Sequence, residues 1–139
     1  MVKKMCKLLF TVFLAGCISV SGPPATNDDR TRLYDDVTYS RLCEAVMATF
    51  LQLGADITVL DEDHGLLNGK VRLTSDLRSP LEGRTRMIYT YYYVTFVHTE
   101  SRGIMIQLNI VTSYEDGFMP REGNKTAYDK FWDLVNRNL

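Results

Sequence analysis

Residues 104–110 read Ile104-Met105-Ile106-Gln107-Leu108-Asn109-Ile110. Every second residue from Ile104 to Ile110 is a branched apolar residue, and Gln107 and Asn109 lie between them. Because successive side chains of a strand point to opposite faces, this period of two predicts a strand with one buried face and one wet face. One-sided burial of this kind is typical of antiparallel sheets. The stretch therefore predicts one strand of an antiparallel sheet.

Three further strands are expected before this one. Residues 57–59 and 67–73 alternate apolar and polar side chains on either side of a turn at residues 61–65, which indicates a hairpin. After an expected loop at residues 74–83, residues 84–99 are rich in tyrosine and valine, which are residues that favour strands. Consecutive strands joined by short turns predict a four-stranded antiparallel meander.

A helix is expected before the first strand. Six residues recur at helical spacing and form one apolar stripe: Leu42, Ala45, Val46, Thr49, Phe50 and Leu53. Thr38 or Ser40 can cap the start of this helix. Gly54 can adopt the left-handed backbone conformation that often ends a helix. Cys43 lies beside the stripe, where a small core residue is expected rather than a reactive thiol.

A second helix is expected at residues 126–138, after a loop at residues 115–125. Thr126 and Asp129 have the spacing of a capping box. With both helices packed on one sheet face, the fold is a two-layer α+β domain. We expect these residues to form its core: Leu42, Val46, Phe50, Leu53, Ile57, Ile104, Ile106, Leu108, Ile110, Phe131 and Leu134.

Near the N-terminus, a short segment with three lysines and a short apolar run precede Leu14-Ala15-Gly16-Cys17. The apolar run has the roughly 7–10 residues of a secretory signal, whereas a membrane-spanning helix needs about 20. The order resembles a bacterial lipoprotein signal peptide that ends in a lipobox. The resemblance implies that residues 1–16 are removed and that Cys17 carries a diacyl or triacyl anchor. The alternative is an ordinary signal peptide with an incidental cysteine.

The lipobox resemblance also implies a location. Ile18 follows the cysteine, in place of the aspartate that favours retention in the inner membrane, so the outer membrane is expected, with the protein facing the periplasm. Residues 17–30 are small, polar and proline-rich, and we expect them to form a flexible lipidated tether. Residues 31–139 then form a single domain.

Composition limits the possible functions of the mature chain. Without residues 1–16, 13 basic and 17 acidic side chains remain, a net charge of about −4, which argues against broad binding of nucleic acid. Cys6 leaves with the signal peptide and Cys17 takes lipid, so Cys43 is the one thiol left and no intrachain disulfide can form.

The chain resembles a group of small bacterial lipoproteins of uncharacterised function over most of residues 31–139. The resemblance lies in Thr31-Arg32-Leu33-Tyr34, in the helix end at residues 51–57, in Gly65-Leu66-Leu67 and in the Tyr128-x-x-Phe131-Trp132 ending. The order of helix, meander and helix is also similar to the helix-grip domains of the BamC lipoprotein of the β-barrel assembly machinery. This chain has one such domain where BamC has two.

Two groups of side chains indicate a binding surface. Four basic residues, two on each of two expected neighbouring strands, would converge into one exposed patch if the strands pair: Lys70, Arg72, Arg84 and Arg86. Three tyrosines, Tyr89, Tyr91 and Tyr93, share one face of their strand. A solvated edge and a structural tyrosine row are the alternatives. As a binding surface, the patch would hold an acidic envelope protein, anionic lipid headgroups or sugar phosphates.

Catalytic and metal chemistry find little support. Asp61-Glu62-Asp63-His64 lacks the Asp-x-Asp-x-Asp-Gly spacing of a calcium loop and is interpreted as a solvated turn. Two histidines without a Gly-x-Ser-x-Gly elbow give no recognisable triad, so neither an enzyme nor a cofactor is expected. We therefore expect a non-catalytic binding or assembly module of the cell envelope. The alternative is a lipoprotein that holds a small apolar ligand or lipid between helices and sheet.

Overall fold

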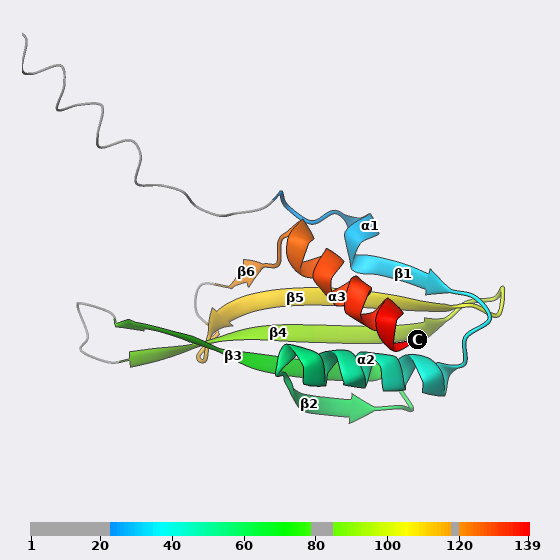
Figure 1. Cartoon of the computed structure of the whole chain (residues 1–139), viewed down its shortest axis with the longest axis horizontal. Coiled ribbons are helices and arrows are strands. Elements are labelled where there is room, and N and C mark those ends of the chain that lie inside the picture. The colour runs from blue at the N-terminus through cyan, green and yellow to red at the C-terminus, as the bar shows by residue number, and fades with distance from the viewer. Residues whose placement is uncertain (1–22, 79–84, 118–119) are drawn as a thin grey trace, which may run out of the picture.

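The computed structural model describes residues 23–78, 85–117 and 120–139, with the backbone alone at 74–78, 85 and 86. Figure 1 shows three helices and six strands in these parts of the chain. In chain order the elements are α1 (Asn27–Arg30), β1 (Thr31–Tyr34), α2 (Tyr39–Leu53), β2 (Asp56–Asp61), β3 (Leu66–Arg78), β4 (Thr85–His98), β5 (Ile104–Tyr114), β6 (Arg121–Glu122) and α3 (Lys125–Asn138). Residues 1–22, which include Cys17 and the expected signal peptide, lie outside the described residues.

The strands form one antiparallel sheet in the order β1-β5-β4-β3-β2, and β6 also pairs with β5. The predicted α+β class is confirmed, and β2 to β5 follow one another as a meander. The predicted count of four strands was wrong, because β1 and β6 add to the edge of β5. These strands have four and two residues, too few for a period of two to stand out in the sequence.

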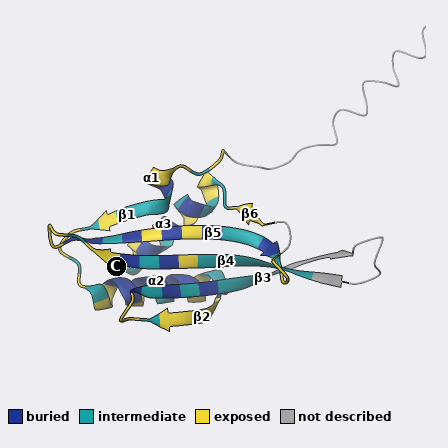
Figure 2. Ribbon diagram, turned by 180° about the vertical axis from the view of Figure 1, so that it is seen from behind, coloured by how far each residue is buried: buried dark blue, intermediate teal, exposed yellow. Residues whose placement is uncertain are grey.

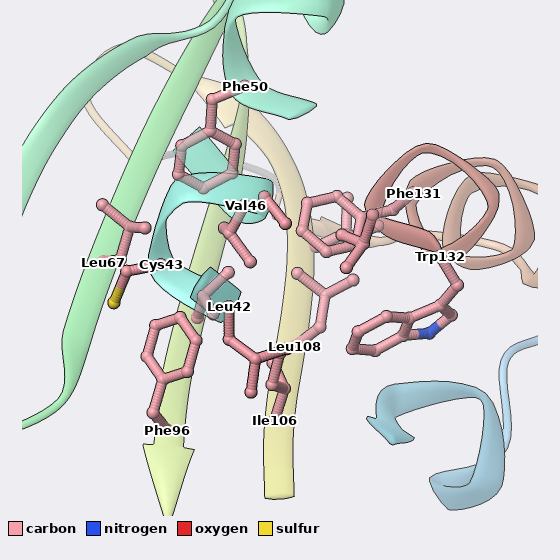
Figure 3. Close-up of a cluster of buried hydrophobic side chains, with 14 of the residues drawn as sticks. Leu42, Cys43, Val46, Phe50, Leu67, Phe96, Ile106, Leu108, Phe131 and Trp132 are labelled. Carbon is pink, nitrogen blue, oxygen red and sulfur yellow. The ribbon is translucent and has the colours of Figure 1, made fainter. Parts of the chain in front are cut away.

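Both longer helices lie on the same face of the sheet, in front of it in Figure 1 and behind it in Figure 2. The core between the two layers contains Phe50 of α2 and Phe131 of α3, both with no exposed surface (Figure 3). Gly69 of β3 makes room for Phe50, since a Cβ there would lie 3.1 Å from the phenylalanine Cδ2 atom. The helices are thus held to the sheet by interlocking aromatic side chains.

The capping residues of α2 are the expected ones, whereas the residue that caps the start of α3 differs from the expected one. The Thr38 side chain accepts a hydrogen bond from the Arg41 backbone N–H, and Gly54 ends the helix in the left-handed conformation. At α3 the cap is Asn124, which accepts from the Ala127 N–H, and not the expected Thr126. The helix therefore begins at Lys125, and the Thr126 hydroxyl has no capping role.

Most of the expected core residues are buried, with three exceptions. Ile57 is 40% exposed because β2 is an edge strand with no neighbour on its outer side in the described sheet. Leu53 and Leu134 are half-buried. Cys43 is buried, as expected of a small core residue, and burial raises the pKa of its thiol.

The structure describes residues 23–30 of the expected tether and packs them against the domain, with the Pro23 carbonyl oxygen accepting a hydrogen bond from the Lys125 backbone N–H. Asn27–Arg30 form α1, and the side chain of Trp132 fastens this turn by donating its indole N–H to the Asp29 carbonyl oxygen at 2.6 Å. Asp29 in turn accepts hydrogen bonds from the backbone N–H and hydroxyl of Thr26, which lower the pKa of its carboxyl group. The ordered domain thus begins before residue 31, because this capping box and Trp132 hold the preceding turn.

The expected loop at residues 74–83 is also shorter than predicted. Strand β3 continues to Arg78 and pairs with β4 as far as Thr85, with a shift in register between Leu73 and Leu77. Polar residues on both strands hide this extension in the sequence, since the hairpin runs beyond the apolar core. The remaining positions of the expected loop, 79–83, and residue 84 are outside the described residues.

Candidate functional site

The face of the sheet that the helices leave uncovered is the candidate site, and we call it the open face. It points toward the viewer in Figure 2. On β4, Tyr92 faces the helix layer, with its ring centroid 5.9 Å from those of Phe50 and Phe131. Alternation along the strand therefore puts Tyr91 and Tyr93 on the open face.

A row of three tyrosines runs along β4 on the open face. The ring centroids of Tyr89 and Tyr91 are 6.1 Å apart, and those of Tyr91 and Tyr93 are 6.2 Å apart with nearly parallel planes. Tyr93 is 43% exposed. Burial raises the pKa of Tyr91, and the neighbouring Tyr93 and Tyr89 add to this, so its phenol stays neutral at physiological pH. The row offers aromatic surface and phenol hydroxyl groups.

Two cations lie beside the tyrosine row. Lys70 pairs with Tyr91 across the β3–β4 ladder, and Arg72 pairs with Tyr89, so both side chains share the open face. The Lys70 ammonium group lies 5.0 Å from the centroid of the Tyr89 ring, a cation–π geometry. Arg72 is exposed. The fold thus brings Lys70, Arg72 and the tyrosine row together.

The other two residues of the expected basic patch are not placed. Arg84 lies outside the described residues. Arg86 has only its backbone described, opposite Leu77 on β3. The surface that can be described therefore contains two of the four expected cations.

A hollow of about 550 Å³ continues the open face beyond Tyr93, and we call it the polar hollow. Its lining residues are Asn27, Arg30, Thr31, Tyr93, Thr95, Gln107, Leu108 and Asn109. The wall arises where β1 and β6 leave the middle of β5 unpaired and α1 stands beside it. Sequence reasoning missed this hollow, because its parts come from α1, β1, β4 and β5, and no local spacing links them.

Arg30 of α1 is one of the residues that line the polar hollow, and it forms an ion pair with Glu122 of β6. Its Nη2 atom lies 2.7 Å from a carboxylate oxygen of Glu122 on β6, which neutralises the guanidinium charge. Its Nε atom is buried and has no hydrogen-bond partner among the described residues. A buried donor without an acceptor is costly, and the accessible part of the Arg30 side chain, which is 29% exposed, is what a ligand in the hollow can contact.

A second hollow, of about 390 Å³, lies on the helix side between the two layers. Leu53, Tyr92, Ile110 and Ala127 form its apolar lining, and the Thr90 and Thr112 hydroxyl groups, 2.9 Å apart, lie on its floor. The space next to it is filled by Phe50 and other core side chains. This hollow offers room for a ligand at one end of the layer between helices and sheet.

The residues considered for metal binding are spread apart. The His64 ring lies 2.9 Å from the Asp61 carboxylate within the β2–β3 turn, and hydrogen bonds from His64 lower the pKa of Asp61. His98 instead packs against the Tyr39 ring, with 5.7 Å between centroids. Within the described ranges, no three histidine, cysteine or acidic residues are grouped so that they could hold a metal ion.

Comparisons with known proteins add no relative. No protein-family model matches the sequence, and no curated protein is significantly similar to it. None of the described helices is long and apolar enough to cross a membrane.

Proposed function

We propose that this protein is a lipid-anchored accessory lipoprotein of the cell envelope, a non-catalytic binding module at the outer membrane that faces the periplasm. The observation that carries the proposal is the one-sided sheet: two helices cover one face, and the other exposes the tyrosine row with Lys70 and Arg72. Tyrosine and arginine are enriched where proteins bind one another. The open face is thus the binding surface of the domain.

The N-terminal sequence supports the membrane part of the proposal. The similarity of residues 14–17 to a lipobox supplies an anchor at Cys17, and two or more acyl chains make membrane binding durable. The tether keeps the domain close to the membrane surface. This location agrees with the resemblance of residues 31–139 to small bacterial lipoproteins.

The chemistry of the open face indicates the kind of partner. Lys70 and Arg72 favour an acidic envelope protein or anionic lipid headgroups, and the adjacent tyrosines supply contact area. Nucleic acid is a poor fit, because the mature chain carries a net charge of about −4.

A lipoprotein that holds a small apolar ligand between helices and sheet is the second candidate. The apolar lining of the helix-side hollow, which includes Leu53 and Ile110, favours it. Packed aromatic side chains occupy the adjacent core, so a ligand there would reach only the end of the layer.

Reversing the two described cations of the open face tests the proposal. We expect the double substitution Lys70→Glu and Arg72→Glu to lower recovery of crosslinked envelope partners, most strongly at low salt, because exposed charges are screened beyond about 8 Å in physiological salt. Recovery from intact cells at several salt concentrations measures this. Folding stability should change by about 1 kcal/mol, since the half-buried Lys70–Tyr89 cation–π contact is the interaction that is lost.

The matched control makes the same charge change on the helix side. Lys130 and Arg137 are exposed on α3, and their double substitution to glutamate should leave recovery unchanged. If this control lowers recovery as much as the open-face variant does, net charge and not the open face governs binding, and the proposal is wrong.

A further inference from the structure

We infer that the polar hollow is a binding site for a neutral carbohydrate. A short segment of a glycan chain would bind between α1 and Tyr93. This inference rests on the proposed role of the open face and names the chemistry of a ligand for it. The hollow has about 550 Å³, a size typical of small-ligand sites. It also lies at the end of the tyrosine row and not beside the two cations.

The charges of the hollow exclude ionic ligands. Arg30 is the charged residue among those that line it, and the contact of its Nη2 atom with Glu122 at 2.7 Å already neutralises it. An anion would therefore find no free cation in the lining, and a cation would find no free carboxylate. The ligand that fits is uncharged.

The polar character of the lining excludes an apolar ligand. Asn27, Gln107 and Asn109 carry amides, and Thr31 and Thr95 carry hydroxyl groups. Each of these side chains can both donate and accept hydrogen bonds. Sugar hydroxyl groups have the same dual character, so a polyhydroxylated ligand can satisfy donors and acceptors at once.

Two further features fit a sugar. The Tyr93 ring, 43% exposed, stands at the hollow, and the C–H face of a pyranose ring packs against aromatic rings. The Arg30 side chain, 29% exposed, lines the hollow, and its N–H groups that do not contact Glu122 can donate to a sugar oxygen. The hollow thus offers an aromatic platform, neutral polar groups and guanidinium donors to a sugar ring.

Calorimetric titration of the full chain tests this inference. The chain is held in a detergent without a sugar headgroup and titrated with cellotetraose, with the N-acetylglucosamine tetramer and with the galacturonic acid tetramer as anionic comparator. We expect at least one neutral oligosaccharide to bind with a Kd of about 1 mM or lower, and the anionic one to bind more weakly. Absence of binding by both neutral probes would overturn the inference, and so would a preference for the anionic one.

Variants locate the site. Tyr93→Ala and Gln107→Leu should each weaken binding of the neutral oligosaccharide about tenfold, since each removes a contact group from the hollow. Tyr89→Ala is the matched control: it removes the same side chain from the same strand face about 13 Å away, and it should change the affinity by less than about twofold. An equal loss in Tyr89→Ala would contradict the assignment to the hollow.

The outcome also separates this inference from the proposed function. If envelope partners still crosslink to the open face while no oligosaccharide binds, the inference about the hollow is wrong and the binding surface stands. If neither result is obtained, the open face is not a binding surface.

Discussion

Replacing Phe131 with alanine should lower the free energy of unfolding by about 3–5 kcal/mol. The side chain has no exposed surface and lies 6.1 Å from the Phe50 ring, 5.9 Å from the Tyr92 ring and 5.3 Å from the Trp132 ring, measured between centroids. Truncation leaves a cavity that these rigid rings cannot fill. For a domain of this size the loss corresponds to a melting temperature roughly 12–20 °C lower, which thermal or urea unfolding measures.

The control for this prediction lies on the outer surface of α2. Leu51 is 73% exposed, so Leu51→Ala should change stability by less than about 0.5 kcal/mol. Phe50→Ala should cost as much as Phe131→Ala. The combined loss in the double variant should differ from the sum, because the rings share one cavity. If Phe131→Ala leaves the melting temperature unchanged, α3 does not pack on the sheet as described.

Substitution of Cys17 by alanine should abolish incorporation of labelled palmitate and block normal maturation. The thiol is the expected attachment point of the anchor, and removal of the acyl chains removes about 0.8 kcal/mol of membrane affinity for each buried methylene. Metabolic labelling and fractionation of cells measure both effects. Cys43→Ala is the matched control, since that thiol is buried in the core, and labelling should persist in this variant. Labelling that persists in Cys17→Ala would contradict the lipobox interpretation.

Long elements with a clear period could be predicted from the sequence. The stripe that includes Leu42, Val46 and Phe50 gave the position of α2, and the alternation from Ile104 to Ile110 gave β5. Both patterns extend over several turns or strand residues, so the buried face dominates the composition. The position of Gly54 also indicated the end of α2, because a left-handed residue is needed there.

Short elements and edge positions could not be predicted. Strand β1 and helix α1 have four residues each, and they form because β5 offers a free edge and Trp132 offers an indole N–H to the Asp29 carbonyl. These are tertiary contacts with no local pattern. Ile57 alternates correctly, yet it is exposed because its strand is at the edge of the sheet.

The candidate site was predictable in part. Alternation alone put Tyr89, Tyr91 and Tyr93 on one face, and the pairing of β3 with β4 places Lys70 and Arg72 beside them. The sequence could not tell which face of β4 the helices cover, since Tyr92 on the other face is aromatic as well. The polar hollow was beyond sequence reasoning, because α1 and the middle of β5 are brought together only by the fold.

Site-directed photo-crosslinking in intact cells tests most directly whether the open face is the binding surface. A photoreactive phenylalanine analogue replaces Tyr91 on the open face of the full chain or, as the control, Leu51 on the outer side of α2. We expect light-dependent adducts with an envelope component at position 91 and none at position 51. Adducts at position 51 with none at position 91 would show that the helix side binds the partner and would contradict the account.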